Sequence, residues 1–264
     1  MDSRSAEQLP QKELSIKISG KSEADFKHPQ RDEDAIAFDE KAGFAMVLDG
    51  MGGLDDGDRA SQAARDVIVK CIVRVKDDTD PGKVEQEIAR SFNEASDQVK
   101  KKVPRSGTTA VAVKIVGVGK KVAIVASVGD SRVYIFRDGQ LRQITEDDSS
   151  IPLGLRGKFD ETDGNDLDLR KEYEIFSRRN EIMQYLGSGK RLNVHLYQEN
   201  LKGGDKIILT SDGVHDNLRT SEIEEIAGSE DVANSLVSKA FVRSKDNWLR
   251  SKPDDISAVV MEVN

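Results

Sequence analysis

The amino-acid sequence predicts an α+β fold in which antiparallel sheets pack together and helices lie outside them. Strand-like segments occur in groups joined by short turns, which favours antiparallel pairing. Two amphipathic helices follow the first group of strands, and two more precede the last strand. Strands and helices therefore do not alternate as they do around a parallel sheet, and their order is typical of segregated layers.

Each expected strand is a short apolar or alternating run that ends at a turn. Period-two alternation marks the first run, and a turn at residues 39–43 joins the second and third runs into a hairpin. The expected strands cover residues 14–18, 35–38, 44–48, 108–116, 121–128, 132–136, 140–144, 193–197, 206–210 and 256–263.

The expected helices have the apolar face that packing against a sheet requires. The clearest one begins near Ala60, and its apolar residues recur at helical spacing up to Val75. Asp80 and Pro81 then form an N-cap and first-turn pair for a second helix, which runs to the break at Pro104. Shorter helices are expected at residues 180–186, 221–227 and 232–244.

We interpret residues 1–13 as a flexible N-terminal tail and residues 14–264 as a single domain. Within the domain, the stretch 146–180 is charged, contains several glycines and shows little periodicity. A long irregular segment inside a compact domain is usually a functional lid or a disordered insert. We therefore expect a variable lid at about residues 146–180.

The composition limits the classes of partner. The 264 residues carry a formal net charge of −8, which argues against nucleic acid or an anionic membrane as the default partner. No apolar stretch reaches the ~20 residues needed to span a bilayer, and the N-terminus does not resemble a signal peptide. The single cysteine, Cys71, excludes an internal disulfide and is expected to be a packed thiol. We expect a cytoplasmic protein that acts as a monomer.

Carboxylates recur at the ends of the expected strands. One apolar run ends in Asp49-Gly50, and a second leads to Asp212-Gly213. The other strand-end carboxylates are Asp130, Asp254, Glu33 and Asp34. An isolated Asp-Gly pair is usually an ordinary turn. Carboxylates at the ends of strands that pack in one core, however, can converge on one point. Oxygen ligands without histidine or cysteine suit Mg²⁺ or Mn²⁺, and two adjacent cations would balance the clustered negative charge.

A set of short motifs then occurs in a fixed order along the chain. The motifs are Glu33-Asp34, Val47-Leu48-Asp49-Gly50-Met51-Gly52-Gly53, Arg59-Ala60-Ser61, Ser106-Gly107-Thr108-Thr109-Ala110, Val128-Gly129-Asp130-Ser131-Arg132, Gly204-Asp205, Ser211-Asp212-Gly213 and Asp254-Asp255-Ile256-Ser257. The set resembles the bacterial metal-dependent protein serine/threonine phosphatases of the protein phosphatase 2C-like (PPM) class. Each motif is weak alone, whereas the ordered set is specific and extends from about Leu14 to Val263.

The resemblance implies a four-layer α-β-β-α sandwich and a signalling hydrolase. It implies two Mg²⁺ or Mn²⁺ ions whose bridging hydroxide attacks phosphoserine and phosphothreonine directly. The substrates would be phosphorylated proteins, made by a serine/threonine kinase. The family pattern matches Asp49 to the carboxylate that bridges both metals, and the Gly50 carbonyl to a ligand of the second metal. The remaining matches are Asp212 and Asp254 at the first metal, Glu33 and Asp34 around the second through water, and Asp130, Asp212 and Asp216 at a weaker third metal.

The chain departs from the family pattern at the substrate phosphate. The family usually has an arginine four residues before the Glu33 position, and Pro29 stands there instead. Arg31 shares the parity of Pro29 in an extended segment and lies closer to the metal ligands than Lys27. We therefore expect Arg31 to bind the phosphate, with Lys27 as the alternative.

Other side chains invite functional or structural interpretations. Met51 replaces the histidine that some relatives have as a candidate general acid, so His215 is the histidine of most interest. Arg132 is expected to pair with a carboxylate rather than to act in catalysis. Ser131 and Ser211 resemble activated serines only when read in isolation.

Two other functions remain open at this point. A catalytically weak family member could act as a regulatory phosphoprotein-binding module, and Pro29 is the feature that favours this reading. Intact Asp49, Asp212 and Asp254 argue against it. A metal-dependent nuclease is disfavoured by the net charge and by the absence of a basic stripe in the sequence.

Overall fold

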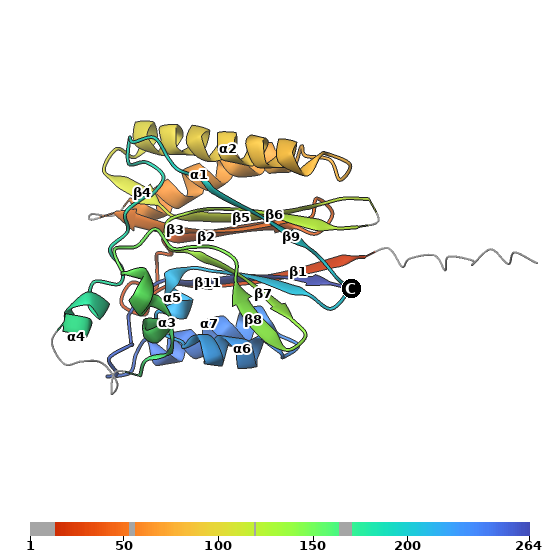
Figure 1. The fold of residues 1–264 in the computed structure, drawn as a ribbon. Helices are drawn as coiled ribbons and strands as arrows, with labels where there is room; N and C mark the ends of the chain where they lie inside the picture. The colour runs from red at the N-terminus through yellow and green to blue at the C-terminus, as the bar shows by residue number, and fades with distance from the viewer. Residues whose placement is uncertain (1–13, 53–55, 119, 164–170) are drawn as a thin grey trace, which may run out of the picture.

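The computed structural model describes residues 14–52, 56–118, 120–163 and 171–264, which form four layers (Figure 1). Two antiparallel sheets face each other in the middle. Helices α1 (Gly57–Ile72) and α2 (Pro81–Lys102) cover one outer face, and α6 (Thr220–Ala227) and α7 (Val232–Arg243) cover the other. The expected α-β-β-α sandwich is confirmed.

The first sheet brings two candidate metal ligands to one edge. Its strand order is β1-β11-β10-β7-β8, and every neighbouring pair is antiparallel. Thr210 pairs with Ala258, so the end of β10 lies beside the beginning of β11. Asp212 and Asp254 therefore lie at the same end of these two neighbouring strands. The strands are β1 (Ile16–Glu23), β11 (Ile256–Val263), β10 (Lys206–Thr210), β7 (Arg132–Arg137) and β8 (Gln140–Gln143).

The second sheet carries two further carboxylates on adjacent strands. Its order is β2-β3-β5-β6-β9, and β4 also pairs with β3. The register of β2 and β3 puts Asp34 directly opposite Asp49. The strands are β2 (Asp34–Asp39), β3 (Phe44–Gly52), β4 (Ser106–Thr108), β5 (Ala110–Val116), β6 (Val122–Val128) and β9 (His195–Asn200).

Three apolar clusters hold the layers together. The middle cluster lies between the sheets, where Val47, Val113, Leu209 and Val259 alternate with residues that face the helices. The outer clusters lie between each sheet and its helices. Helix α2 begins as expected, because the Asp80 side chain accepts a hydrogen bond from the backbone N–H of Lys83 at 3.2 Å.

The segment 146–180 has more structure than its sequence suggests. It contains α3 (Leu153–Glu161) and α4 (Lys171–Phe176), and the rings of Phe159 and Phe176 meet edge to face, 5.3 Å apart. Apolar side chains from both helices and Leu249 form a small separate cluster.

Some sequence-based boundaries were wrong. Residues 180–186 do not form a helix, because this stretch is used for long-range contacts: Leu186 forms a β-bridge with Thr108. A short helix that was not predicted, α5 (Asp212–His215), follows β10. The expected tail at 1–13 and Gly53 of the glycine-rich motif lie outside the described residues.

Candidate metal-dependent active site

Asp49 is held in place through its own backbone. Its N–H donates to Thr109 Oγ1 at 3.1 Å, and its carbonyl accepts from Thr108 Oγ1 at 2.9 Å and from Thr109 N–H at 2.9 Å. These bonds continue the β3 ladder past its pairing with β5. The carboxylate of Asp49 is therefore free to point to the edge of the sheet, beside Asp34.

The glycines of this turn allow the backbone to come unusually close. Gly50 donates its N–H to the carbonyl of Glu33 at 3.1 Å. A Cβ atom on Gly50 would collide with the carbonyl oxygens of Gly57 and Glu33, and a Cβ on Gly57 would meet the Glu33 carboxylate. The Gly50 carbonyl and Glu33 are thus close to Asp49, and only glycine fits at position 50, where the colliding atoms belong to the backbone.

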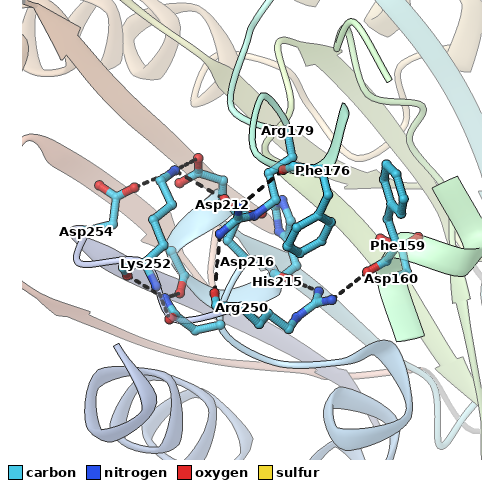
Figure 2. A network of polar contacts seen from close by, with 12 residues as sticks. Phe159, Asp160, Phe176, Arg179, Asp212, His215, Asp216, Arg250, Lys252 and Asp254 are labelled. Atoms are coloured by element: carbon cyan, nitrogen blue, oxygen red, sulfur yellow. Dashed lines mark hydrogen bonds and ion pairs between the residues drawn. The ribbon is translucent and has the colours of Figure 1, made fainter. Parts of the chain in front are cut away.

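Asp212 and Asp254 lie together and share a lysine (Figure 2). Lys252 Nζ contacts the Asp212 carboxylate and lies 2.7 Å from Asp254 Oδ2. It also lies 3.3 Å from Asp216 Oδ2. Lys252 is one residue that sequence reasoning missed beside these aspartates, although it stands only two residues before Asp254.

The residues expected at a third metal lie in two different environments. Asp130 follows β6 and is buried. Asp216 is also buried, and it is engaged by two protein cations: Arg179 Nε lies 3.2 Å from its Oδ1, besides Lys252 at its Oδ2. The third site remains a prediction, and a cation there would compete with these two side chains for Asp216.

The pKa values describe a cluster of carboxylates that are costly to ionise. Burial, followed by the charges of neighbouring carboxylates, raises the pKa of Asp34, Asp49 and Asp130 well above the usual range. Burial also raises the pKa of Asp212 to about 6, although Lys252 opposes the shift. The pKa of Asp216 is lowered despite its burial, because Arg179 and Lys252 favour its charged form.

The donor set fits hard divalent cations. In the part of the chain that the structure describes, five buried aspartate oxygens have no hydrogen-bond partner. Two of them, Asp58 Oδ1 and Asp216 Oδ2, lie within ion-pair distance of Arg31 and Lys252, and the other three are Asp34 Oδ2, Asp130 Oδ1 and Asp212 Oδ1. A buried oxygen of this kind is unfavourable until a cation or a donor reaches it. Over the same residues, no three acidic, histidine or cysteine side chains lie in an arrangement that could hold a metal ion as they stand.

Arg132 has the structural role expected for it. Its guanidinium makes three contacts with Asp147, of which Nη2 to Oδ2 is the shortest at 2.7 Å, and Nη1 lies 2.9 Å from Asp160 Oδ1. Arg132 therefore joins β7 to the beginning and the first helix of the segment 146–180. Ser131 and Ser211 are engaged as well: Ser131 Oγ lies 2.6 Å from Thr109 Oγ1, and Ser211 Oγ accepts from Ser257 N–H at 2.9 Å.

His215 is not placed as a proton donor. It is buried, its Nδ1 lies 3.4 Å from Thr210 Oγ1, and its carbonyl accepts from Arg250. Burial, followed by the charge of Arg132, lowers the pKa of His215 well below the usual value, so the imidazole is neutral at pH 7. His215 serves the packing of α5.

Asp255 is a second residue that sequence reasoning did not assign. Its carboxylate accepts from the backbone N–H of Asp25 at 2.6 Å and of Glu33 at 2.7 Å. It thereby ties the loop 24–33 to the beginning of β11. In this loop Arg31 forms an ion pair with Glu33, and its Nε lies 3.8 Å from Asp58 Oδ1. The binding of phosphate by Arg31 stays a prediction.

One surface groove lies away from the candidate site, and another lies beside it. One of about 560 Å³ runs between α1 and α2, far from the strand-end carboxylates, and Cys71 lines it. This thiol is partly exposed rather than fully packed, and burial together with Glu87 raises its pKa. A groove of about 300 Å³ lies beside the candidate site, between residues 173–180 and 249–253, and Lys252 lines it. The candidate site is chosen for the chemistry of its carboxylates and not for the size of a groove.

Comparison with known proteins identifies the family of this chain. The sequence model of the protein phosphatase 2C family matches residues 18–150, which is half of the chain. A serine/threonine phosphatase, stp, of Listeria welshimeri is 27% identical over 228 residues, covering 83% of this chain and 84% of that protein. The chain therefore belongs to the protein phosphatase 2C family.

Solved structures share the fold. The serine/threonine phosphatase PstP/Ppp of Mycobacterium tuberculosis superposes with a TM-score of 0.73 at 24% identity, covering 94% of this chain and 98% of that one. The catalytic domain of PstP in complex with two manganese ions gives a TM-score of 0.72 at 23% identity, covering 95% and 99%.

Along residues 14–52, 56–118, 120–163 and 171–264, no helix combines the length and apolar character that crossing a membrane requires.

Proposed function

We propose that this chain is a protein serine/threonine phosphatase that depends on two Mn²⁺ or Mg²⁺ ions. The observation that carries the proposal is the meeting of buried, unpartnered carboxylate oxygens from both sheets at one edge. Membership of the protein phosphatase 2C family supports it, as does the name of the Listeria relative. The substrates would be phosphoproteins, with a serine/threonine kinase acting in the opposite direction.

Each carboxylate has a distinct role in this proposal. Asp49 would bridge the two ions, and Asp212 and Asp254 would bind the first. The Gly50 carbonyl would bind the second ion directly, and Glu33 and Asp34 would bind its waters. When bound, two divalent cations supply an activated water and positive charge for the phosphoryl oxygens. The protein supplies no nucleophile, which agrees with the engaged hydroxyls of Ser131 and Ser211.

Arg31 is the proposed partner of the substrate phosphate. Its side chain is 26% exposed and lies beside Glu33, between the loop 24–33 and the beginning of α1. A guanidinium can donate two parallel hydrogen bonds to a phosphate, whereas Lys27 could act only as a point charge. Arg31 would exchange part of its contact with Glu33 for the substrate.

The segment 146–180 is the proposed lid. Arg132 and Arg179 connect it to the carboxylate site, and the groove beside Lys252 lies between it and residues 249–253. A phosphopeptide bound in this groove would have its phosphate near Asp212 and Asp254. The lid would then contribute to the choice of substrate rather than to the chemical step.

The test is hydrolysis of a phosphothreonine peptide by the full chain with Mn²⁺, with Mg²⁺ and with excess EDTA. We expect activity with either metal and none with EDTA. Asp49→Asn is the matched negative variant, because it keeps the shape of the side chain and removes the charge that bridges the ions. We expect it to lose more than about tenfold in kcat, or ~1.4 kcal/mol of barrier.

The outcomes separate the two candidate functions. Turnover that persists in EDTA, or in Asp49→Asn, would exclude the two-metal mechanism. If the wild-type chain binds a phosphothreonine peptide but does not hydrolyse it with either metal, the chain is a phosphoprotein-binding module instead.

A further inference from the structure

The ammonium group of Lys252 sits where three carboxylates meet (Figure 2). It donates a hydrogen bond to Asp212 and lies within ion-pair distance of Asp254 and Asp216, so three carboxylates surround its charge. Its side chain is 19% exposed. Among the described residues, Lys252 therefore supplies positive charge to Asp212, Asp254 and Asp216.

The backbone of Lys252 is fixed by a buried asparagine. Asn217 Oδ1 accepts from Lys252 N–H at 2.9 Å, and Asn217 Nδ2 donates to the Lys252 carbonyl at 2.9 Å. Asn217 is fully buried and also donates to the carbonyl of Gly213, next to Asp212. Arg250, nearly fully buried, anchors the same stretch through the carbonyls of Phe159 and Leu218, at 2.5 and 3.1 Å. The position of Lys252 is thus built into the fold.

We propose that Lys252 is a tethered cation that competes with a divalent ion for Asp212 and Asp254, and so sets the affinity of the first metal position. The proposal rests on the proposed function, because it assumes that these two aspartates bind a metal. It adds a residue that controls loading of the site and is not itself a ligand.

Competition follows from the shared aspartates. Lys252 contacts Oδ2 of Asp212 and Oδ2 of Asp254 and leaves Asp212 Oδ1 without a partner, so a metal ion that binds both carboxylates would lie close to the ammonium. Both are positive, so they repel each other at this distance, and burial weakens the screening by water. Lys252 must therefore withdraw before the ion can bind both carboxylates.

The structure offers a place for the side chain to go. Lys252 lines the groove of about 300 Å³ between residues 173–180 and 249–253. A long, flexible lysine can turn its ammonium into this open space while Asn217 holds its backbone. The metal-free protein is then stabilised by Lys252, and the loaded protein by the ion. In either state the carboxylates have a positively charged partner. The difference in free energy between the two states sets the affinity for the metal ion.

The test is calorimetric titration of Mn²⁺ into the EDTA-stripped full chain. Lys252→Met keeps the length of the side chain and removes its charge, and we expect its first-site Kd to fall by about tenfold or more. Lys252→Arg keeps the charge and should bind within about threefold of wild type. Lys17→Met is the matched control. Lys17 is exposed and lies opposite Glu262 in the β1–β11 register, at the end of β11 away from Asp254.

Thermal unfolding gives a second measurement that a purely structural role would not produce. In EDTA, Lys252→Met should unfold at a lower temperature than wild type, because it leaves buried carboxylates without a counter-charge. In saturating Mn²⁺ most of that loss should disappear. An equal loss in both conditions would mean that Lys252 only supports the fold, and would overturn the proposal.

The remaining outcomes are also decisive. Equal or weaker Mn²⁺ binding by Lys252→Met, with normal binding by wild type, overturns the role of Lys252 and leaves the proposed function intact. A wild-type chain that binds no Mn²⁺ overturns both. If Lys252→Met does not fold, Lys252→Gln replaces it in the same comparison.

Discussion

Neutralising Asp212 should abolish turnover and at the same time stabilise the metal-free protein. In the metal-free state burial raises the pKa of Asp212 from an ordinary 3.8 to about 6. The two-unit difference corresponds to about 3 kcal/mol of folding free energy that is lost when the buried carboxyl ionises. Asp212→Asn removes this cost, and for a chain of this size we expect a rise in Tm of roughly 5–10 °C in EDTA at pH 8.

The pH dependence fixes the sign of the effect. Because the folded pKa is raised, the contribution of the protonated carboxyl to stability is fully present below about pH 3.8 and is lost as the pH rises through about 6. The advantage of Asp212→Asn over wild type should therefore be largest at pH 8 and shrink to about half at pH 5. In Mn²⁺ the order should reverse, since only wild type can bind the first ion fully.

The assay is thermal unfolding in EDTA at the two pH values, together with phosphopeptide hydrolysis. Asp205→Asn is the matched control, because Asp205 is also a buried aspartate and directly precedes β10, which Asp212 follows, but it is paired with Arg137 at 2.7 Å. That variant should lose stability. If Asp212→Asn is destabilised in EDTA at pH 8 as Asp205→Asn is, the carboxylates do not repel one another as described. Retained turnover would mean that Asp212 is not a metal ligand.

Three further predictions follow from the contacts around the site. Arg31→Ala should raise KM for a phosphopeptide several-fold and cost ~1–3 kcal/mol in kcat/KM, and Lys27→Ala should cost less; wild-type values for both single variants and the double variant would leave the phosphate to the metals alone. Asp130→Ala should lower kcat while calorimetry still finds two tight Mn²⁺ sites, and loss of both would assign Asp130 to the core pair. Asp147→Asn leaves the buried Arg132 with Asp160 as its remaining acidic partner, so the free energy of unfolding should fall by about 3 kcal/mol in urea titrations. Replacing the pair by Arg132→Met with Asp147→Leu should restore most of that loss, and failure to do so would argue for a role of Arg132 beyond pairing.

The sequence by itself determined the fold class and named the carboxylates of the proposed site. Apolar periodicity gives most strands and the two long helices, because burial on one face requires a pattern that depends only on local spacing. Asp49 and Asp212 could be named because an aspartate followed by glycine after an apolar run is a local signal. The capping of α2 by Asp80 was equally local. Arg132 could be expected to pair with a carboxylate, since a charge beside buried strands needs a partner. Its actual partners could not be predicted.

Only the tertiary structure decided which charges meet. Asp34 faces Asp49 because of the β2–β3 register, and Asp212 reaches Asp254 because β10 pairs with β11. Residues 180–186 have helical spacing, yet they are used in contacts with distant strands, and tertiary contacts outweigh propensity in so short a stretch. Lys252 appears in the sequence as an ordinary charged residue before a strand. It becomes the cation of the proposed site only because a buried asparagine holds its backbone beside Asp212 and Asp216, which lie far from it in the sequence, as well as beside the nearby Asp254. Such long-range electrostatics leave no local pattern to read.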